Sequence, residues 1–196
     1  MKNLLSTLSI ACASLLLAAQ PSHALTVSSS NDNGNIVNTA FVGGLQAGVD
    51  FGFFNTLGAS VTFLLEQGDV DAGSVLFSSI ISALPAGAVL DQVTLSLDAG
   101  TSFFVVGGAT TLDGGAPSVS VFGNGVLLSL APASSEIYLG NSLGLGATNW
   151  TIQLGSLGVG GKFTLTVTPV PEPETYALML AGLGLVGTIV RRRRAR

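Results

Sequence analysis

The sequence predicts an all-β protein: a β-sandwich (jelly-roll-like) main domain followed by a single C-terminal transmembrane helix. Short apolar or alternating runs recur about every ten residues from position 60 onward, as in β-sandwiches. Gly, Asp, Asn and Pro separate these runs, and no amphipathic helix interrupts them. A charge-free apolar run then precedes an arginine cluster at the end of the chain. We expect residues 25–169 to form one domain of ordinary size.

Nine segments between positions 60 and 168 are predicted as strands. Alternation of apolar and polar residues is clearest within 93–97 and 162–168, the pattern of a strand with one buried face. Residues 79–84 are also compatible with a helical turn. The predicted strands are 60–66, 74–81, 89–97, 101–106, 118–122, 126–130, 136–139, 149–154 and 162–168.

The remaining segments of the main domain are predicted as turns and loops. Residues 25–55 are rich in Gly, Asn and Ser and are interpreted as a polar lead-in with a loop at 28–35. Asn124-Gly125, between two predicted strands, indicates a tight hairpin, since Asn and Gly tolerate the positive φ of a primed turn. Residues 140–161 are biased toward Gly, Leu and Ser, with one strand-like island around Trp150.

The charge distribution is strongly asymmetric. Between Leu25 and Val170 the chain has nine acidic residues and a single basic one, Lys162, so this part carries a formal charge of −8. Five of the seven basic residues lie in the last six positions. A main domain this acidic repels phosphate backbones, and nucleic acid is therefore not an expected partner.

Cys12 and His23, the only cysteine and the only histidine, both lie near the N-terminus. If the N-terminal segment is removed, the mature protein has no disulfide, no Ser-His-Asp triad and no Cys/His zinc site. The sequence therefore predicts that the protein is not an enzyme, and a carboxylate-based enzyme remains only a distant alternative. No cofactor is expected.

The N-terminus predicts a secretory signal peptide spanning residues 1–24. Lys2 supplies positive charge, residues 4–19 form the apolar region, and Ser22-His23-Ala24 is a small-residue cleavage site. Cleavage between Ala24 and Leu25 would leave Leu25 as the first mature residue. The alternative is a short membrane anchor, for which the apolar run is short.

Residues 170–196 predict a second sorting signal, at the C-terminal end of the sequence. Val170 is followed by Pro171, Glu172 and Pro173, and the fixed φ of proline makes this segment stiff and extended. Residues 176–190 carry no charge, and as a helix they would span about 22 Å of the ~30 Å hydrocarbon core. Basic residues follow and set the orientation, with the tail cytoplasmic and the main domain outside. These residues are Arg191, Arg192, Arg193, Arg194 and Arg196.

This order resembles the PEP-CTERM sorting signal of Gram-negative bacteria. The resemblance covers residues 170–196: the Pro171-Glu172-Pro173 triplet, the apolar span and the arginine cluster. It implies recognition and cleavage by a membrane protease called exosortase, and an association with exopolysaccharide and biofilm. The main domain more loosely resembles the FxDxF type of these proteins, because residues 49–54 have the right residue types without a strict motif. The alternative for the tail is an ordinary membrane anchor that is retained.

Two weaker site predictions concern the main domain. Glu66, Asp69 and Asp71 place hard oxygen ligands close together, a candidate calcium site that Asp50 could join, and residues 31–35 form a second oxygen-rich loop. The alternative is a solvated acidic loop in each case. Trp150 with Tyr138 could form a platform on which a sugar stacks, although a lone tryptophan in a strand more often packs in the core.

The sequence thus predicts an exported protein held briefly in the inner membrane and then left at the cell surface or in the extracellular matrix. Its expected partners are an exosortase-type membrane protease, the inner membrane during sorting, and exopolysaccharide. The predicted role is structural or adhesive in biofilm, and the alternative is a carbohydrate-binding (lectin-like) module.

Overall fold

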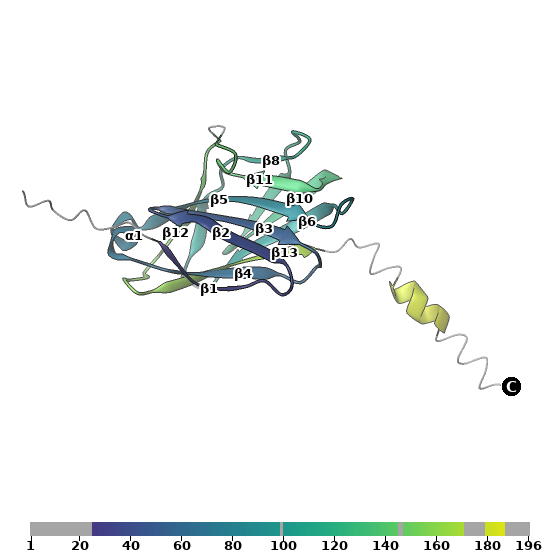
Figure 1. Ribbon diagram of the computed structural model, residues 1–196, viewed down its shortest axis with the longest axis horizontal. Helices are drawn as coiled ribbons and strands as arrows, with labels where there is room; N and C mark the ends of the chain where they lie inside the picture. The colour runs from purple at the N-terminus through teal and green to yellow at the C-terminus, as the bar shows by residue number, and fades with distance from the viewer. Residues whose placement is uncertain (1–24, 99, 145–146, 171–178, 187–196) are drawn as a thin grey trace, which may run out of the picture.

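The computed structural model describes residues 25–98, 100–144, 147–170 and 179–186, and this part of the chain is mostly β-sheet (Figure 1). The all-β prediction is confirmed. Within the described residues, the folded domain has one α-helix, α1 (Gln67–Ala72). The strands are β1 (Thr26–Asn31), β2 (Ile36–Gly43), β3 (Gln46–Phe53), β4 (Ala59–Leu64), β5 (Ser74–Ala83), β6 (Leu90–Leu97), β7 (Ser102–Val105), β8 (Ala109–Thr111), β9 (Ser118–Phe122), β10 (Gly125–Ser134), β11 (Glu136–Leu139), β12 (Trp150–Gln153) and β13 (Lys162–Val170).

One sheet has six strands in the order β1-β4-β13-β6-β10-β9, and every neighbouring pair in it is antiparallel. The last strand of the domain, β13, therefore lies in the interior of the sheet, between β4 and β6. Its alternating sequence buries Phe163, Leu165 and Val167 and turns the intervening threonines to the other face. Phe163 stacks on Phe63 of β4, with ring centroids 4.9 Å apart.

The second sheet has the strand order β2-β3-β5-β11-β8, with β12 paired to β5 and β7 paired to β12. Its one parallel pair is β3–β5. The chain between these two strands passes through β4 of the other sheet and through α1 before it returns. Such a connection is required because parallel neighbours cannot be joined by a tight turn.

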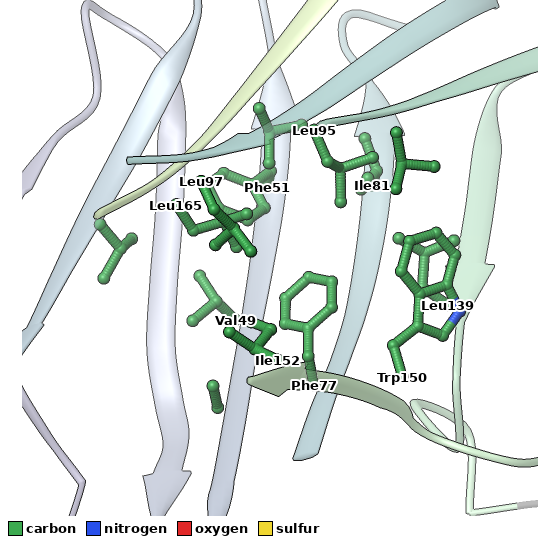
Figure 2. Close-up of a cluster of buried hydrophobic side chains, with 14 of the residues drawn as sticks. Val49, Phe51, Phe77, Ile81, Leu95, Leu97, Leu139, Trp150, Ile152 and Leu165 are labelled. Carbon is green, nitrogen blue, oxygen red and sulfur yellow. The ribbon is translucent and has the colours of Figure 1, made fainter. Parts of the chain in front are cut away.

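The two sheets contribute to a single hydrophobic cluster. Val49 and Phe51 come from β3 of the seven-stranded sheet, and Leu97 and Leu165 come from the six-stranded sheet (Figure 2). Because successive residues of a strand point to opposite faces, the residues between them face away from this cluster. The core thus fixes which side chains of each sheet are left for solvent.

Three features of the fold differ from the sequence prediction. Residues 25–55 form β1, β2 and β3 where a polar lead-in was expected. By contrast, residues 79–83 belong to β5, as the predicted strand 74–81 indicates, and the alternative of a helical turn there is wrong. The β9–β10 hairpin pairs Phe122 with Gly125, so its two turn residues are Gly123 and Asn124, one position earlier than expected. Gly123 has a φ of 56°. A positive φ at the first of two turn residues is typical of a type II′ hairpin turn, in which glycine is favoured at that position.

The third difference is α1, which occupies the acidic segment predicted as a loop. The backbone of Glu66 at its N-cap is extended, and the N–H of this residue donates to Asp69 Oδ2 at 2.9 Å. Gly73 ends the helix in a left-handed conformation with a φ of 67°. Glu66 and Asp69 thus form a capping box that begins a helix. The acidic composition of the segment does not by itself indicate this helix.

Residues 179–186 are also helical. The predicted transmembrane run, 176–190, lies partly outside the described residues, and so do the signal peptide, the Pro171–Pro173 triplet and the arginine cluster. Within the described residues, no helix combines the length and the apolar character needed to cross a bilayer.

Candidate functional site

The C-terminal signal begins at the end of a core strand. Pro169 pairs with Val93 and Val170 pairs with Gln92, both in β6. The next residue in the sequence is Pro171. The large apolar side chains of the helical residues that follow are exposed: Met179, Leu180, Leu183, Leu185 and Val186.

At the other end, Leu25 is the first described residue. Its side chain is buried in the core, and its N–H donates to Gly44 O at 3.3 Å. The predicted cleavage bond to Ala24 therefore lies directly beside the folded domain. The cleavage itself stays a prediction, because Ala24 is outside the described residues.

Trp150, the predicted sugar platform, is 0 % exposed. Its ring packs against Phe77 and Phe103 with centroids 6.2 and 5.7 Å away, and its indole N–H donates to Gly108 O at 3.0 Å. A ring with no exposed surface offers no face to a sugar, so the interpretation of Trp150 as a core residue is the correct one. Figure 2 shows the side chain among the core residues.

Tyr138 does not form a sugar platform with Trp150, because the ring of Trp150 is buried in the core. Tyr138 is half-buried on the outer face of the seven-stranded sheet, opposite Ile80 of β5, and its hydroxyl donates to Glu136 Oε2. This hydrogen bond, together with burial and the negative charge of Glu136, raises the pKa of Tyr138 to about 12. The phenol is therefore neutral and positioned at physiological pH.

The structure does not gather Glu66, Asp69 and Asp71 into a metal-ligand set. Asp69 is buried and accepts the N–H of Glu66, whereas Asp71 Oδ1 accepts a hydrogen bond of 2.7 Å from Gln67 Nε2. Asp50, which was expected to join this candidate calcium site, lies on β3 and not in the segment of α1. Among the described residues, no three acidic, histidine or cysteine side chains are close enough to hold an ion. Calcium binding at these residues thus has no geometric support in this part of the chain.

The oxygen-rich loop at 31–35 uses its polar groups within the protein. Asp32 Oδ1 accepts the N–H of Gly34 at 3.0 Å. Asn35 is buried, and its amide connects this loop to residues 54–57: Oδ1 accepts from Phe54 N at 3.0 Å and Nδ2 donates to Leu57 O at 2.8 Å. The predicted ligand loop is therefore a structural junction between two connections.

A pocket that sequence reasoning did not find lies on the outer face of the seven-stranded sheet. Its volume is about 590 Å³, within the usual range for small-molecule sites. Ala47, Val49 and Phe51 of β3 point into the core, so the residues that alternate with them face this pocket. It is lined by Asn38, Phe41, Gln46, Gly48, Asp50, Ser78, Ile80, Asn141 and Ser142.

Cross-strand pairing assembles this pocket from three strands and one loop. Phe41 and Asn38 of β2 lie opposite Gly48 and Asp50 of β3. Gly48 is in turn the parallel neighbour of Ser78 in β5. Because paired residues share a face of the sheet, these side chains form one continuous surface.

The polar groups of the pocket are held in place by hydrogen bonds. Gln46 Nε2 donates to Ser78 Oγ at 3.1 Å, and the N–H of Ile80 donates to Asp50 Oδ1 at 2.8 Å. Burial raises the pKa of Asp50, and the hydrogen bond from Ile80 partly opposes this shift. Ser142 Oγ is buried and has no hydrogen-bond partner among the residues that the structure describes.

A second, smaller pocket adjoins the first. Its volume is about 50 Å³, and its lining includes Tyr138 and Thr110 from β11 and β8. Asn141 and Ser142 line both pockets. The outer face of the seven-stranded sheet therefore presents polar side chains from β2 across to β8.

Comparison with known proteins bears on the tail. No curated protein matches the chain, and no solved structure matches it. Residues 169–194 match the family model described as the PEP-CTERM protein-sorting motif. The match begins at Pro169 inside β13 and runs into the arginine cluster. The chain therefore carries a PEP-CTERM protein-sorting motif, which marks it for export and for exosortase-type sorting at the membrane.

Proposed function

We propose that this protein is a non-catalytic structural or adhesive component of the bacterial surface or matrix, delivered there by its sorting motif. The observation that carries the proposal is the PEP-CTERM motif at residues 169–194, which begins within the last strand of the folded domain. In this proposal residues 25–169 form a β-sandwich ectodomain, and residues 176–190 span the inner membrane until an exosortase removes them. The sandwich is supported by the single core to which both sheets contribute.

Export leaves the folded domain outside. Its charged residues are few and almost all acidic, a composition suited to a hydrated matrix. An adhesive role is supported by the exposed apolar residues of β9, an edge strand of the six-stranded sheet. Val121 and Phe122 are both more than half exposed. An exposed edge with apolar side chains can pair with another chain or pack on a surface.

The sorting part of the proposal is tested by the mass of the exported protein. Intact-mass measurement of the protein recovered from the matrix should give an N-terminus at Leu25 and a C-terminus that lacks the arginines. Replacing Pro171 and Pro173 with Ala should leave uncleaved protein in the membrane fraction. A mature wild-type protein that still contains Arg191 to Arg196 would contradict processing.

The structural role is tested separately. Cells that lack the protein should form less biofilm mass than wild-type cells, and expression of the full chain should restore it. Unchanged biofilm in the deletion strain, with processing intact in the wild type, would contradict the structural role alone.

A carbohydrate-binding module is the second candidate function. The observation that favours it is the polar pocket on the outer face of the seven-stranded sheet, with an exposed aromatic ring at its margin. This candidate does not depend on how the tail is processed.

A further inference from the structure

We propose that the pocket between β2, β3, β5 and the Asn141–Ser142 loop binds a neutral saccharide segment, held against the ring of Phe41. The inference rests on the second candidate function and assigns it a site and a ligand class. None of the residues in this site was predicted from the sequence as a glycan contact.

The first argument is the position of Phe41. Its side chain is 64 % exposed although it lines the pocket. An aromatic ring held at the margin of a polar cavity offers an apolar face beside hydrogen-bonding groups. A pyranose ring has the matching character, because its C–H groups form an apolar face and its hydroxyls surround the edge.

The position of Phe41 is itself fixed by the strand opposite. A Cβ added at Gly48 would lie 2.7 Å from the Cβ of Phe41 and 2.8 Å from its carbonyl oxygen. Only glycine permits this close approach of β2 to β3. Gly48, which lines the pocket beside Phe41, therefore has no side chain that could fill the cavity.

The second argument is the set of hydrogen-bonding groups. Amides come from Asn38 and Gln46, hydroxyls from Ser78 and Ser142, and a carboxylate from Asp50. Vicinal sugar hydroxyls both donate and accept, and such a mixed set serves both directions. Ser78 is only 4 % exposed and bonded to Gln46, so this part of the pocket is already positioned before a ligand arrives.

Ser142 contributes a buried hydroxyl group to the wall of the pocket. Its Oγ is buried and has no hydrogen-bond partner within the described ranges, although buried hydroxyls are normally bonded. The residue lines both the large pocket and the small one.

Other ligand classes fit the pocket less well. Its single ionisable lining group is the carboxylate of Asp50, which repels phosphate and other anions. One carboxylate is too few for a divalent cation, which takes several oxygen ligands. An apolar ligand would leave the amides and hydroxyls without partners. A neutral polyhydroxylated molecule satisfies both the ring and the polar groups.

The experiment uses the full chain, purified in detergent from expressing cells, on an array of neutral trisaccharides. The array carries glucose, galactose, mannose and N-acetylhexosamine oligomers and acidic counterparts of each. We expect binding to at least one neutral trisaccharide. Phe41→Ala should weaken that binding about tenfold, since the stacked contact is lost. Because Phe41 is exposed, the variant should keep the wild-type melting temperature.

Phe104→Ala is the matched control. Phe104 is 70 % exposed, lies on β7 and does not line this pocket. It should leave binding unchanged. No binding of any array member at millimolar concentration would overturn both the site and the carbohydrate-binding candidate. Binding that Phe41→Ala leaves unchanged would overturn the site and keep the candidate.

Discussion

Gly48 lies directly opposite Phe41 in the ladder between β2 and β3, and the two backbones approach so closely that no side chain fits at position 48. A Cβ there would meet both the Cβ and the carbonyl oxygen of Phe41. Next to this pair, the register of the ladder shifts between Asn38 and Phe41. The irregularity and the glycine together bring the Phe41 ring to the pocket.

Gly48→Ala should therefore destabilise the protein. The added methyl group must displace the backbone of β2, and such overpacking costs about 1–3 kcal/mol of unfolding free energy. Urea unfolding of the full chain followed by circular dichroism measures the change. Gly158→Ala is the control, because a Cβ at that position meets nothing within 4 Å and its backbone is not left-handed. Equal stabilities of the two variants would contradict the close approach.

Asn35→Ala should also destabilise the fold. The buried amide of Asn35 connects the loop at 31–35 to residues 54–57, because its oxygen accepts hydrogen bonds and its nitrogen donates one. Its removal leaves backbone groups of Phe54 and Leu57 without their partners, and we expect a loss of about 3 kcal/mol in urea unfolding. Asn31→Ala is the control, since Asn31 is exposed and its Oδ1 accepts a local hydrogen bond from the N–H of Asn33. A loss for Asn35→Ala no larger than that for Asn31→Ala would show that the junction is not needed.

Asp50 should give the unfolding free energy a dependence on pH. Burial raises the pKa of Asp50 above its ordinary value of 3.8, so the folded state holds the proton more tightly than the unfolded state. The stability from this difference is fully present below pH 3.8 and is lost as the pH rises through the folded pKa.

Asp50→Asn removes this loss and keeps an oxygen that can accept the N–H of Ile80. Relative to wild type, the variant should gain unfolding free energy as the pH rises from 3.8 and then level off above the folded pKa. Urea unfolding at a series of pH values measures the difference. A difference that is constant from acid to neutral pH is the result that would rule out this effect.

Tyr138 should ionise late. Its hydrogen bond to Glu136, burial and the charge of Glu136 raise its pKa to about 12. Since the pKa is raised in the folded state, the corresponding stability is present below pH 10.0 and is lost as the pH rises through about 12. Ultraviolet titration of the phenolate should show this step, and Tyr138→Phe should remove it and so distinguish it from Tyr176. Glu136→Gln should move the step to lower pH, because the charge is removed.

Trp150 should report the integrity of the core. It is the only tryptophan in the chain, and it is fully buried between Phe77 and Phe103. Its fluorescence should be blue-shifted and protected from acrylamide, and it should shift to the red on unfolding. Strong quenching of the native protein by acrylamide would show that the ring is accessible. That result would also revive Trp150 as a sugar platform.

The strands from β4 onward were largely predictable from the sequence, because their alternation and the turn residues between them agree. The predicted bounds of β9 and β11 match the observed strands residue for residue. Within Phe103-Phe104, one ring is buried and the next is exposed, which is the period of two expected of a strand. Here local pattern and tertiary structure indicate the same element.

The first three strands were not predicted, although β3 carried a signal. Ala47, Val49, Phe51 and Phe53 alternate as the buried residues of β3, but glycine and polar residues stand between them and lower the apolar content of the segment. The low apolar content of the segment therefore predicts a polar lead-in, although its period of two is that of a strand. The glycine at position 48 is explained only by the neighbouring strand, which the sequence does not identify.

The pocket could not be predicted for a related reason. Its side chains come from β2, β3, β5 and a later loop, and the parallel β3–β5 pair joins strands with β4 and α1 between them in sequence. Amides and serines so far apart resemble ordinary surface residues until the pairing is known. By contrast, every part of the sorting motif is contiguous, and the sequence alone identified it.

The position of β13 has a mechanical consequence. This strand pairs with β4 along Lys162–Val167 and with β6 along Leu165–Val170, and its last residues continue into the sorting motif. A pull on the tail therefore acts along an interior strand and shears two hydrogen-bonded ladders together, whereas an edge strand would peel from a single neighbour. The fold thus meets a pull on its C-terminal end with two ladders at once.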